Sequence, residues 1–466
     1  MLLARKLVNV STEALNRTMG TAVAITTDEY WMPFTNNRSF KKNPKIISRA
    51  DGVFYYTDDG KELYDGISGL WCVNAGHNNK KIISAVQKQV EKLDFVPSFN
   101  ISHELPYKFS KELLKLVPNR GFGQVFFTMC GSTAVDTSMK MALAYHRSRG
   151  EGSRVRFIGR ERGYHGVGFG GISIGGILSN RKAFSGASLP FVDHLPHTHS
   201  LKDMAFSKGL PNWGLHLADE LERIIALHDA STIAAVFVEP VPGSTGVLPP
   251  PKGYLQKLRE ICDKHGILLV FDEVINGFGR LGKSFATEYF DVTPDMITCA
   301  KGLTNSVVPQ GAVISQAKIY KQLMDSADKD SQATIEFFHG YTYTGHPLAM
   351  AAGIATLEVY QEEGLFERAN DLAPYFQEGI HSLKGLPNVI DIRNVGLMGA
   401  IELAPIPGNP SKRGSDIYDR AFEKGVYARL TGNTLACAPP LISTKAHIDR
   451  LFNTLGEAIV ESSKAF

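Results

Sequence analysis

One stretch of the chain decides the fold class: Ile267-Leu268-Leu269-Val270-Phe271-Asp272-Glu273-Val274, an apolar run that ends in two carboxylates. A strand that is apolar at every position, instead of at alternate ones, is typical of parallel sheets buried on both faces. Ligands of open α/β sheets bind at the carboxyl ends of such strands. We therefore predict an α/β fold with a mostly parallel sheet and with Asp272 at its ligand-binding edge.

Further strand-like runs alternate with helix-like segments between about residues 80 and 345, at 124–128, 155–159, 232–238, 296–299 and 311–314. This alternation indicates a sheet covered by helices on both faces. Before this block, residues 53–64 predict a hairpin around an Asp58-Asp59-Gly60 turn. After it, residues 347–360 predict a long helix, followed by an α+β tail.

The composition favours a small-molecule enzyme. Lys and Arg number 50 against 47 Asp and Glu, and the two signs are interspersed, so no electrostatic footprint for nucleic acid is present. No stretch reaches the roughly 18 apolar residues of a membrane span, and residues 1–8 are apolar only in patches. Five scattered cysteines without a C-x-x-C pair argue against a disulfide framework and a zinc site, so we expect a cytoplasmic protein without a metal.

A lysine follows at the end of another strand-like run, in Cys299-Ala300-Lys301-Gly302, 29 residues (301 − 272) after Asp272. Both side chains are expected at the same sheet edge. A desolvated lysine can form a Schiff base, and a carboxylate facing a pyridine nitrogen keeps that nitrogen protonated, which makes the ring a good electron sink. The alternative is a buried Asp–Lys ion pair that serves only the fold.

Two further segments supply groups that suit a flat, phosphorylated ligand. Gly131 and Ser132 follow a strand and open a helix, where backbone N–H groups and a hydroxyl can hold a phosphate. Tyr164 and His165 lie between two glycines just beyond the next strand, so an aromatic ring could stack on the ligand with Val274 on its other face. Read alone, the first segment is a weak signal that also suits a helix N-cap, and the second is more typical of an ordinary buried tyrosine.

Two glycine motifs suggest nucleotide binding. Residues 277–284 match the phosphate-loop pattern G-x-x-x-x-G-K-[ST], which makes a P-loop ATPase a rival hypothesis, but the loop and the acidic residue follow the same strand, whereas that mechanism needs two. Residues 166–171 match G-x-G-x-x-G but are separated from their strand by polar residues. Neither motif favours a nucleotide enzyme here.

Over nearly its whole length the chain resembles the class III aminotransferases. The resemblance rests, in order, on Gly131-Ser132, Tyr164-His165-Gly166, Glu239-Pro240, Asp272-Glu273-Val274, Gly277–Gly282, Lys301-Gly302 and Gly340–Pro347. Within that class, residues 31–38 and 69–77 are similar to the ω-amino acid–pyruvate and amine–pyruvate transaminases. The resemblance implies a fold-type-I pyridoxal-phosphate (PLP) transferase. It implies a large PLP-binding domain (81–345), a small α+β domain formed by residues 1–80 and 346–466, and a homodimer or tetramer with shared active sites.

Carried over residue by residue, the resemblance makes Lys301 the Schiff-base lysine and Asp272 the partner of the pyridine nitrogen. The further cofactor-binding residues that it implies are Gly131, Ser132, Tyr164, Glu239, Val274 and, from the partner subunit, Thr342. The substrate pocket that it implies is walled by Phe34, Trp71, Tyr164 and Phe99 from the other chain, with Arg429 binding a carboxylate. Relatives usually carry an acidic or amide side chain at the position of Thr133.

The activity implied is transfer of an amino group from an ω-amino acid such as β-alanine, or from a primary amine, to pyruvate. The products are alanine and an aldehyde, ketone or semialdehyde. An aminomutase or a decarboxylase on the same scaffold is the nearest alternative. Stoichiometric consumption of a second carbonyl substrate would distinguish a transaminase from both. The sequence leaves the physiological donor, the enantioselectivity and the oligomeric state open.

Overall fold

The computed structural model describes residues 27–327 and 334–466; residues 1–8, which bear on localisation, lie outside these ranges. Of the described residues, those from 27 to 48 and those from Arg49 onward form two compact units. The first contains the short helix α2 (Asn37–Phe40), whose start is capped by the Asn36 side chain accepting the N–H of Ser39. Strand β1 (Ile47–Asp51) begins at the end of this unit.

The second unit is built on a seven-stranded sheet in the order β4-β10-β9-β8-β7-β5-β6. Strands β5 to β9 pair in parallel, whereas β10 runs antiparallel to both β4 and β9. The strands are β4 (Phe122–Thr128), β5 (Arg156–Arg160), β6 (Val192–Leu195), β7 (Ile233–Val238), β8 (Leu268–Asp272), β9 (Met296–Cys299) and β10 (Gly311–Gln316). The predicted α/β class and mostly parallel sheet are confirmed, and β6 is the strand of this sheet that the sequence analysis missed.

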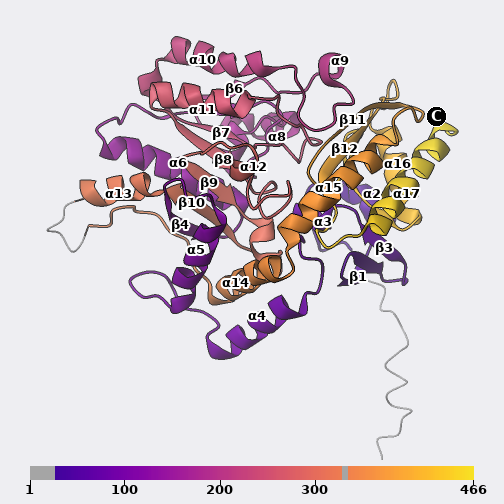
Figure 1. Cartoon of the computed structure of the whole chain (residues 1–466), viewed down its shortest axis with the longest axis horizontal. Helices are drawn as coiled ribbons and strands as arrows, with labels where there is room; N and C mark the ends of the chain where they lie inside the picture. The colour runs from indigo at the N-terminus through magenta and orange to yellow at the C-terminus, as the bar shows by residue number, and fades with distance from the viewer. Residues whose placement is uncertain (1–26, 328–333) are drawn as a thin grey trace, which may run out of the picture. The chain divides into compact units, whose positions relative to one another are not determined.

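Alternate residues of the central strands enter different cores, as expected for a sheet buried on both faces. Val236 and Leu269 pack with the core beneath α10 (Glu220–His228) and α11 (Tyr254–His265). Phe237 and Val270 pack with α6 (Gly131–Ser148) on the opposite face. Figure 1 shows α10 and α11 near β6 and β7, and α6 with α13 (Ala317–Ser326) near β4 and β10.

Two smaller sheets lie outside the central one. The predicted hairpin is present as β2 (Phe54–Thr57) and β3 (Glu62–Asp65), and β3 pairs in parallel with β13 (Val426–Tyr427). The other sheet has the order β11-β12-β15-β14. Its strands are β11 (Val389–Val395), β12 (Met398–Leu403), β14 (Arg429–Thr431) and β15 (Thr434–Cys437). The β3–β13 pairing brings segments from both ends of the chain into one sheet.

The predicted long helix is α14 (Pro347–Glu362), which starts with a proline where no N–H partner is needed. The other long helices are α4 (Lys80–Lys92), α5 (Glu104–Leu116), α15 (Leu365–His381), α16 (Lys412–Glu423) and α17 (Lys445–Ser463). The short ones are α3 (Ser68–Trp71), α7 (Phe169–Ile174), α8 (Leu178–Phe184), α9 (Leu201–Met204), α12 (Ala286–Tyr289), η1 (Ser185–Ala187), η2 (Leu215–Asp219), η3 (Ala230–Thr232) and η4 (Lys301–Thr304). Among the described residues, no helix is both long and apolar enough to span a bilayer.

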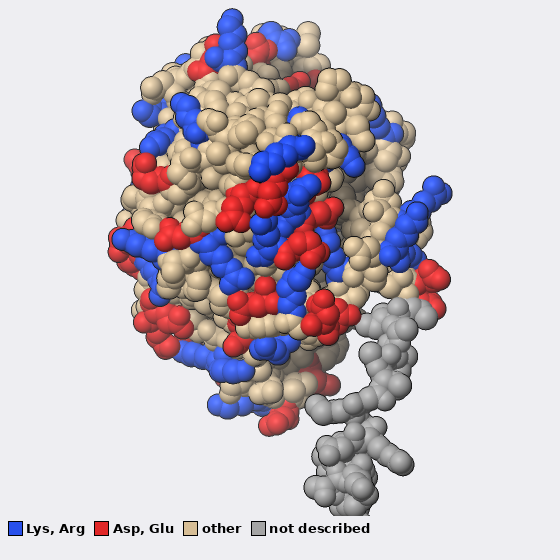
Figure 2. All heavy atoms as spheres, turned by 90° about the vertical axis from the view of Figure 1, so that its right-hand side faces the viewer, with Lys and Arg blue, Asp and Glu red and all other residues tan. Residues whose placement is uncertain are grey.

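The face that carries α16 and α17 shows basic and acidic side chains interspersed (Figure 2). Lys424 pairs with Glu457 at 3.1 Å and with Glu461 at 2.9 Å, and Arg450 pairs with Glu62 at 2.9 Å. Exposed pairs of this kind contribute little stability each. On this face they keep the two signs of charge mixed, as the sequence predicts.

Candidate active site

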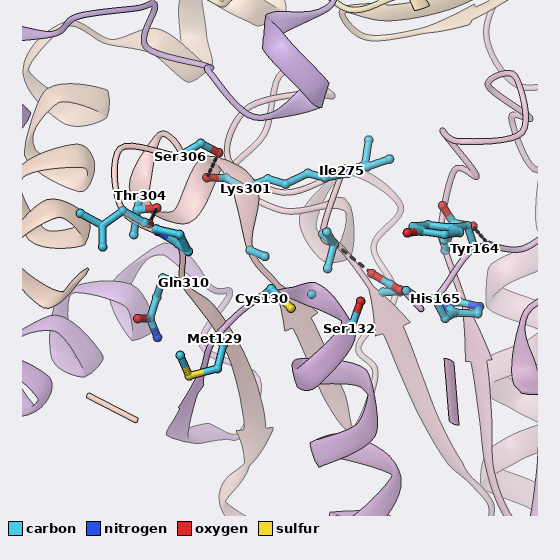
Figure 3. Close-up of a pocket in the computed structure, with 18 residues that line it drawn as sticks. Met129, Cys130, Ser132, Tyr164, His165, Ile275, Lys301, Thr304, Ser306 and Gln310 are labelled. Carbon is cyan, nitrogen blue, oxygen red and sulfur yellow. Dashed lines mark hydrogen bonds and ion pairs between the residues drawn. The ribbon is translucent and has the colours of Figure 1, made fainter. Parts of the chain in front are cut away.

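A cavity of about 300 Å³ opens at the carboxyl edge of the central sheet. It brings together side chains from the ends of β5, β7, β8 and β9 and the start of α6, which are far apart in the sequence (Figure 3). Seven of the predicted site residues line it: Gly131, Ser132, Tyr164, Glu239, Asp272, Val274 and Lys301. This is the edge at which ligands of open α/β sheets bind.

The carboxylate of Asp272, at the end of β8, has a partner that sequence reasoning missed. The Nδ1 of His165 lies 2.8 Å from Asp272 Oδ2, and the Val274 N–H donates to Oδ1 at 3.1 Å. Since a carboxylate only accepts, Nδ1 carries the proton in this bond. The other ring nitrogen, Nε2, is buried without a hydrogen-bond partner among the described residues. His165 thereby orients Asp272 toward the cavity.

The other carboxylate of the same stretch, Glu273, points away from the cavity. Its oxygens accept the N–H groups of Ala286 and Thr287, the latter at 3.0 Å, and so cap α12. Burial raises the pKa of Glu273 to about 7. Only Asp272 of this pair is therefore placed for chemistry.

Lys301 follows β9 and extends its side chain toward Ile275 across the cavity (Figure 3). Its ammonium makes no hydrogen bond or ion pair with any residue of 27–327 or 334–466. Burial lowers the pKa of Lys301, and the nearby Cys72 and Asp272 partly offset this effect. Its backbone has a positive φ of 53°, an uncommon conformation for a residue with a side chain. A desolvated amine held in this way is suited to attack a carbonyl.

Glu239, directly after β7, is buried on the wall next to Tyr164. Its carboxylate accepts the N–H of Tyr164 at 2.8 Å and that of Gly243 at 3.3 Å. Burial, with Asp272 nearby, raises the pKa of Glu239 to about 7, although His165 opposes the shift. Glu239 therefore holds the backbone of Tyr164 and can change protonation near neutral pH.

The start of α6 presents backbone N–H groups and the Ser132 hydroxyl to the cavity. The Thr133 side chain caps this helix start: its Oγ1 accepts the N–H of Met129 at 3.1 Å and that of Cys130 at 3.0 Å. This is the reach-back half of a capping box, normally made by a longer side chain. A threonine can therefore replace the acidic or amide residue of its relatives at the helix start.

Glycines shape the cavity beside this helix. A Cβ on Gly131 would lie 2.9 Å from a methyl of Val274, and one on Gly166 would lie 2.3 Å from Ser132 Oγ. Gly166 also has a φ of +92°. A planar pyridine ring that bears a phosphate fits this cavity. The glycines leave space for the ring, the N–H groups at the start of α6 suit the phosphate, and the Lys301 amine and the Asp272 carboxylate suit the ring substituents and nitrogen.

Arg429 on β14 makes no hydrogen bond or ion pair within the described segments, and its charge acts on both Tyr164 and Lys301. An unpaired guanidinium beside a cavity is available to a carboxylate ligand. Trp71 is 3% exposed and packs in the core that also contains Ile275, a residue of the cavity lining, but Trp71 itself does not line the cavity.

The other predicted substrate or cofactor residues are not part of the cavity lining either. Phe99 is 56% exposed and contacts the position of Gly340, and Thr342 is exposed in the same region. Phe34 belongs to the first compact unit, where it is 71% exposed.

Both nucleotide-like motifs have a structural explanation. Residues 277–284 fold into a tight turn, with the Phe278 N–H donating to the Ser284 carbonyl at 2.7 Å, and Lys283 pairs with Glu288. In the 166–171 motif, Gly168 and Gly170 make room for the carboxylate of Asp136, which would lie 2.4 Å from a Cβ on either. The glycines therefore serve local packing.

Comparison with known proteins agrees with this geometry. The family model "Aminotransferase class-III" matches residues 35–459. An omega-aminotransferase of Caulobacter vibrioides is 57% identical over 92% of this chain and 96% of its own length. A beta-alanine–pyruvate aminotransferase of Pseudomonas aeruginosa is 48% identical over 92% of this chain and 95% of its own. A PLP-bound amine transaminase from an uncultivated Pseudomonas species has a TM-score of 0.85 at 32% identity, covering 93% of this chain and 98% of that one. The chain belongs to the class III aminotransferases.

Proposed function

We propose that this aminotransferase carries an amino group from an ω-amino acid such as β-alanine, or from a primary amine, to pyruvate. The single observation that carries the proposal is the cavity that holds an unpaired, desolvated Lys301 opposite the Asp272–His165 pair. Relatives named omega-aminotransferase, at 57% identity, and beta-alanine–pyruvate aminotransferase, at 48% identity, support the substrate class.

The cofactor is PLP, whose ring, when bound, supplies the electron sink for the electrons released at the donor carbon. Asp272 would face the ring nitrogen, Gly131 and Ser132 would hold the phosphate, and Tyr164 and Val274 would lie on either side of the ring. Glu239 would fix Tyr164 through its backbone N–H. These roles follow from the lining of the cavity and from the family resemblance.

Lys301 has two tasks in this proposal. Its Nζ would hold the cofactor covalently in the resting enzyme, and as a free amine it would take up and hold the proton that leaves the donor carbon. Both tasks require an unprotonated amine, which burial favours because it lowers the pKa of Lys301. The acceptor half-reaction uses the same proton transfer in reverse.

The substrate side must accept a carboxylate in one half-reaction and a different group in the other. Arg429 would bind the carboxylate of pyruvate or β-alanine, and it is available to do so because its guanidinium has no partner in 27–327 or 334–466. The family resemblance assigns the apolar walls to Trp71, Tyr164 and Phe34, and it assigns the completion of the site to Phe99 and Thr342 of a second copy. The exposure of Phe99 and Thr342 supports a homodimer, or a tetramer, with shared active sites.

The division into a large domain (81–345) and a small one (1–80 with 346–466) stays a prediction, supported by the β3–β13 pairing. A cytoplasmic location is proposed because all five cysteines are free and two of them, Cys72 and Cys130, are not buried.

The test is the absorption spectrum of the purified holoenzyme before and after β-alanine, then an arylalkylamine, then pyruvate. The proposed function requires a visible cofactor band that the donor removes and pyruvate restores, with alanine formed in equal amount. Repeated turnover of the donor without pyruvate, beyond one equivalent per active site, would indicate a decarboxylase or an aminomutase instead. The Lys301→Ala variant should lose both the pH-dependent visible band and turnover, and retained catalysis would reject the role of Lys301.

A further inference from the structure

Arg280, in the glycine loop that mimics a phosphate loop, is a fully buried cation with unusual partners. Its Nη1 donates to the carbonyls of Leu397 (3.3 Å) and Pro439 (2.7 Å). Its Nη2 donates to Ser68 Oγ at 3.0 Å and Asn74 Oδ1 at 2.7 Å. Every one of these acceptors is neutral, and Nε has no partner among the described residues.

A buried charge without a counter-ion is costly, so its presence calls for a specific reason. Burial lowers the pKa of Arg280 to about 10, so the guanidinium stays charged at neutral pH. The titratable groups that act on it are Tyr360, Cys72, Asp65 and Tyr64. None of them forms an ion pair with it. The cation is solvated almost entirely by oxygen atoms drawn from three separate segments.

One of these segments, residues 67–76, is strained. We call it the wall segment, since it carries Trp71 and Cys72. Ser68 (φ 50°) and Trp71 (φ 63°) both have left-handed backbones, which are unfavourable for residues with a side chain and persist only when neighbours enforce them. Asp65 fixes its start by accepting the Gly69 N–H at 2.6 Å, and His77 lies 2.8 Å from the same carboxylate oxygen. Arg280 holds the segment at two further points.

The other end of the wall segment is bonded to the turn that carries the cavity lysine. The Ala75 N–H donates to Asn305 Oδ1 at 2.9 Å, and the Asn305 amide donates to the Gly76 carbonyl at 2.8 Å. The Asn74 amide that meets the guanidinium also packs on Gly302, where a Cβ would lie 2.8 Å away. These hydrogen bonds and contacts therefore fix the position of the wall segment relative to the turn that carries Lys301.

We propose that Arg280 is a positioning residue for donor selection: it fixes the wall segment against the turn of Lys301. Cys72 is the side chain of this segment that lies near both Lys301 and Arg280. Trp71 directly precedes Cys72 in the chain, so a shift of the wall segment would move the Trp71 ring as well. The inference rests on the proposed function, because it assumes that an aromatic donor packs along this side.

The test compares holoenzymes of wild type, Arg280→Lys and Ile224→Ala. An ammonium has three donors and no planar fork, so lysine cannot serve four fixed acceptors, and a buried lysine loses its proton more readily. Ile224 is a buried residue of α10 that belongs to the same core as Trp71 but whose side chain forms no hydrogen bond with Arg280 or the wall segment, so Ile224→Ala serves as the destabilised control. We expect Arg280→Lys to raise KM for phenylethylamine about tenfold and KM for β-alanine by a smaller factor. Ile224→Ala should leave the ratio of the two KM values as in wild type.

A second readout needs no turnover. In a background with Trp31→Phe and Trp213→Phe, Trp71 is the remaining tryptophan, and acrylamide quenching reports its exposure. The quenching constant should rise at least about twofold in Arg280→Lys and stay unchanged in Ile224→Ala. Equal KM factors for both donors, or quenching no greater than in the control, would overturn the proposal. If Arg280→Lys does not fold, Ser68→Ala removes one acceptor and should move both readouts in the same direction by less. A wild type that never transaminates would reject the proposed function and leave the quenching comparison intact.

Discussion

The bond between His165 and Asp272 offers the sharpest prediction about the site. Replacing His165 by Leu removes the donor 2.8 Å from Asp272 Oδ2 and leaves that carboxylate with the Val274 N–H alone. Hydrogen bonds to charged groups contribute about 1.5–3 kcal/mol. Part of this free energy is lost equally in the apoenzyme and in the holoenzyme, and that part does not affect cofactor affinity. We therefore expect cofactor binding to weaken by about 1–2 kcal/mol, about five- to thirtyfold in Kd.

A matched variant isolates the bond from the volume of the side chain. Asn has nearly the shape of Leu, and its Nδ2 can take the place of the histidine Nδ1, so His165→Asn should bind PLP within about threefold of wild type. The assay is titration of the apoenzyme with PLP, followed by the visible band. Equal affinities of the Leu and Asn variants would refute the reasoning, because they would show that the donor itself contributes nothing.

Three further predictions follow from individual contacts. In Gly166→Ala the new Cβ would lie 2.3 Å from Ser132 Oγ, at a φ of +92°. This variant should weaken PLP binding at least about tenfold in the same titration. Unchanged affinity would contradict the role of Gly166 and Ser132 in holding the phosphate. Arg429→Ala should raise KM for pyruvate more than KM for phenylethylamine, and equal losses in the two KM values would exclude its carboxylate role. The Glu402 carboxylate accepts a hydrogen bond from Arg393 at 2.6 Å. Burial alone would raise the pKa of Glu402, but His199 and Arg393 outweigh it and lower this pKa from 4.5 to about 2. Because its folded-state pKa is depressed, its contribution is present above pH 4.5 and is lost as pH falls toward 2. Glu402→Gln should therefore cost about 2 kcal/mol in urea unfolding at pH 7, with the difference from wild type shrinking between pH 4.5 and 2.

Local sequence predicted the central strands, because a parallel sheet covered on both faces requires runs that are apolar at every position. It missed β6, since Val192-Asp193-His194-Leu195 lies at the sheet edge and mixes polar with apolar residues. Edge strands are covered less completely than central ones. Their apolar pattern is correspondingly weak.

The sequence by itself determined the α/β class and the meeting of Asp272 and Lys301 at one edge, because parallel strands bring their carboxyl ends together whatever the helices between them do. It could not reveal that His165 holds Asp272, or that Arg280 joins Ser68 and Asn74. Those partners lie 107, 212 and 206 residues apart. Such contacts depend on how separate elements pack and on which way each side chain turns. Only the tertiary structure decides these, because no local pattern of polarity records the neighbour that a buried polar group will find.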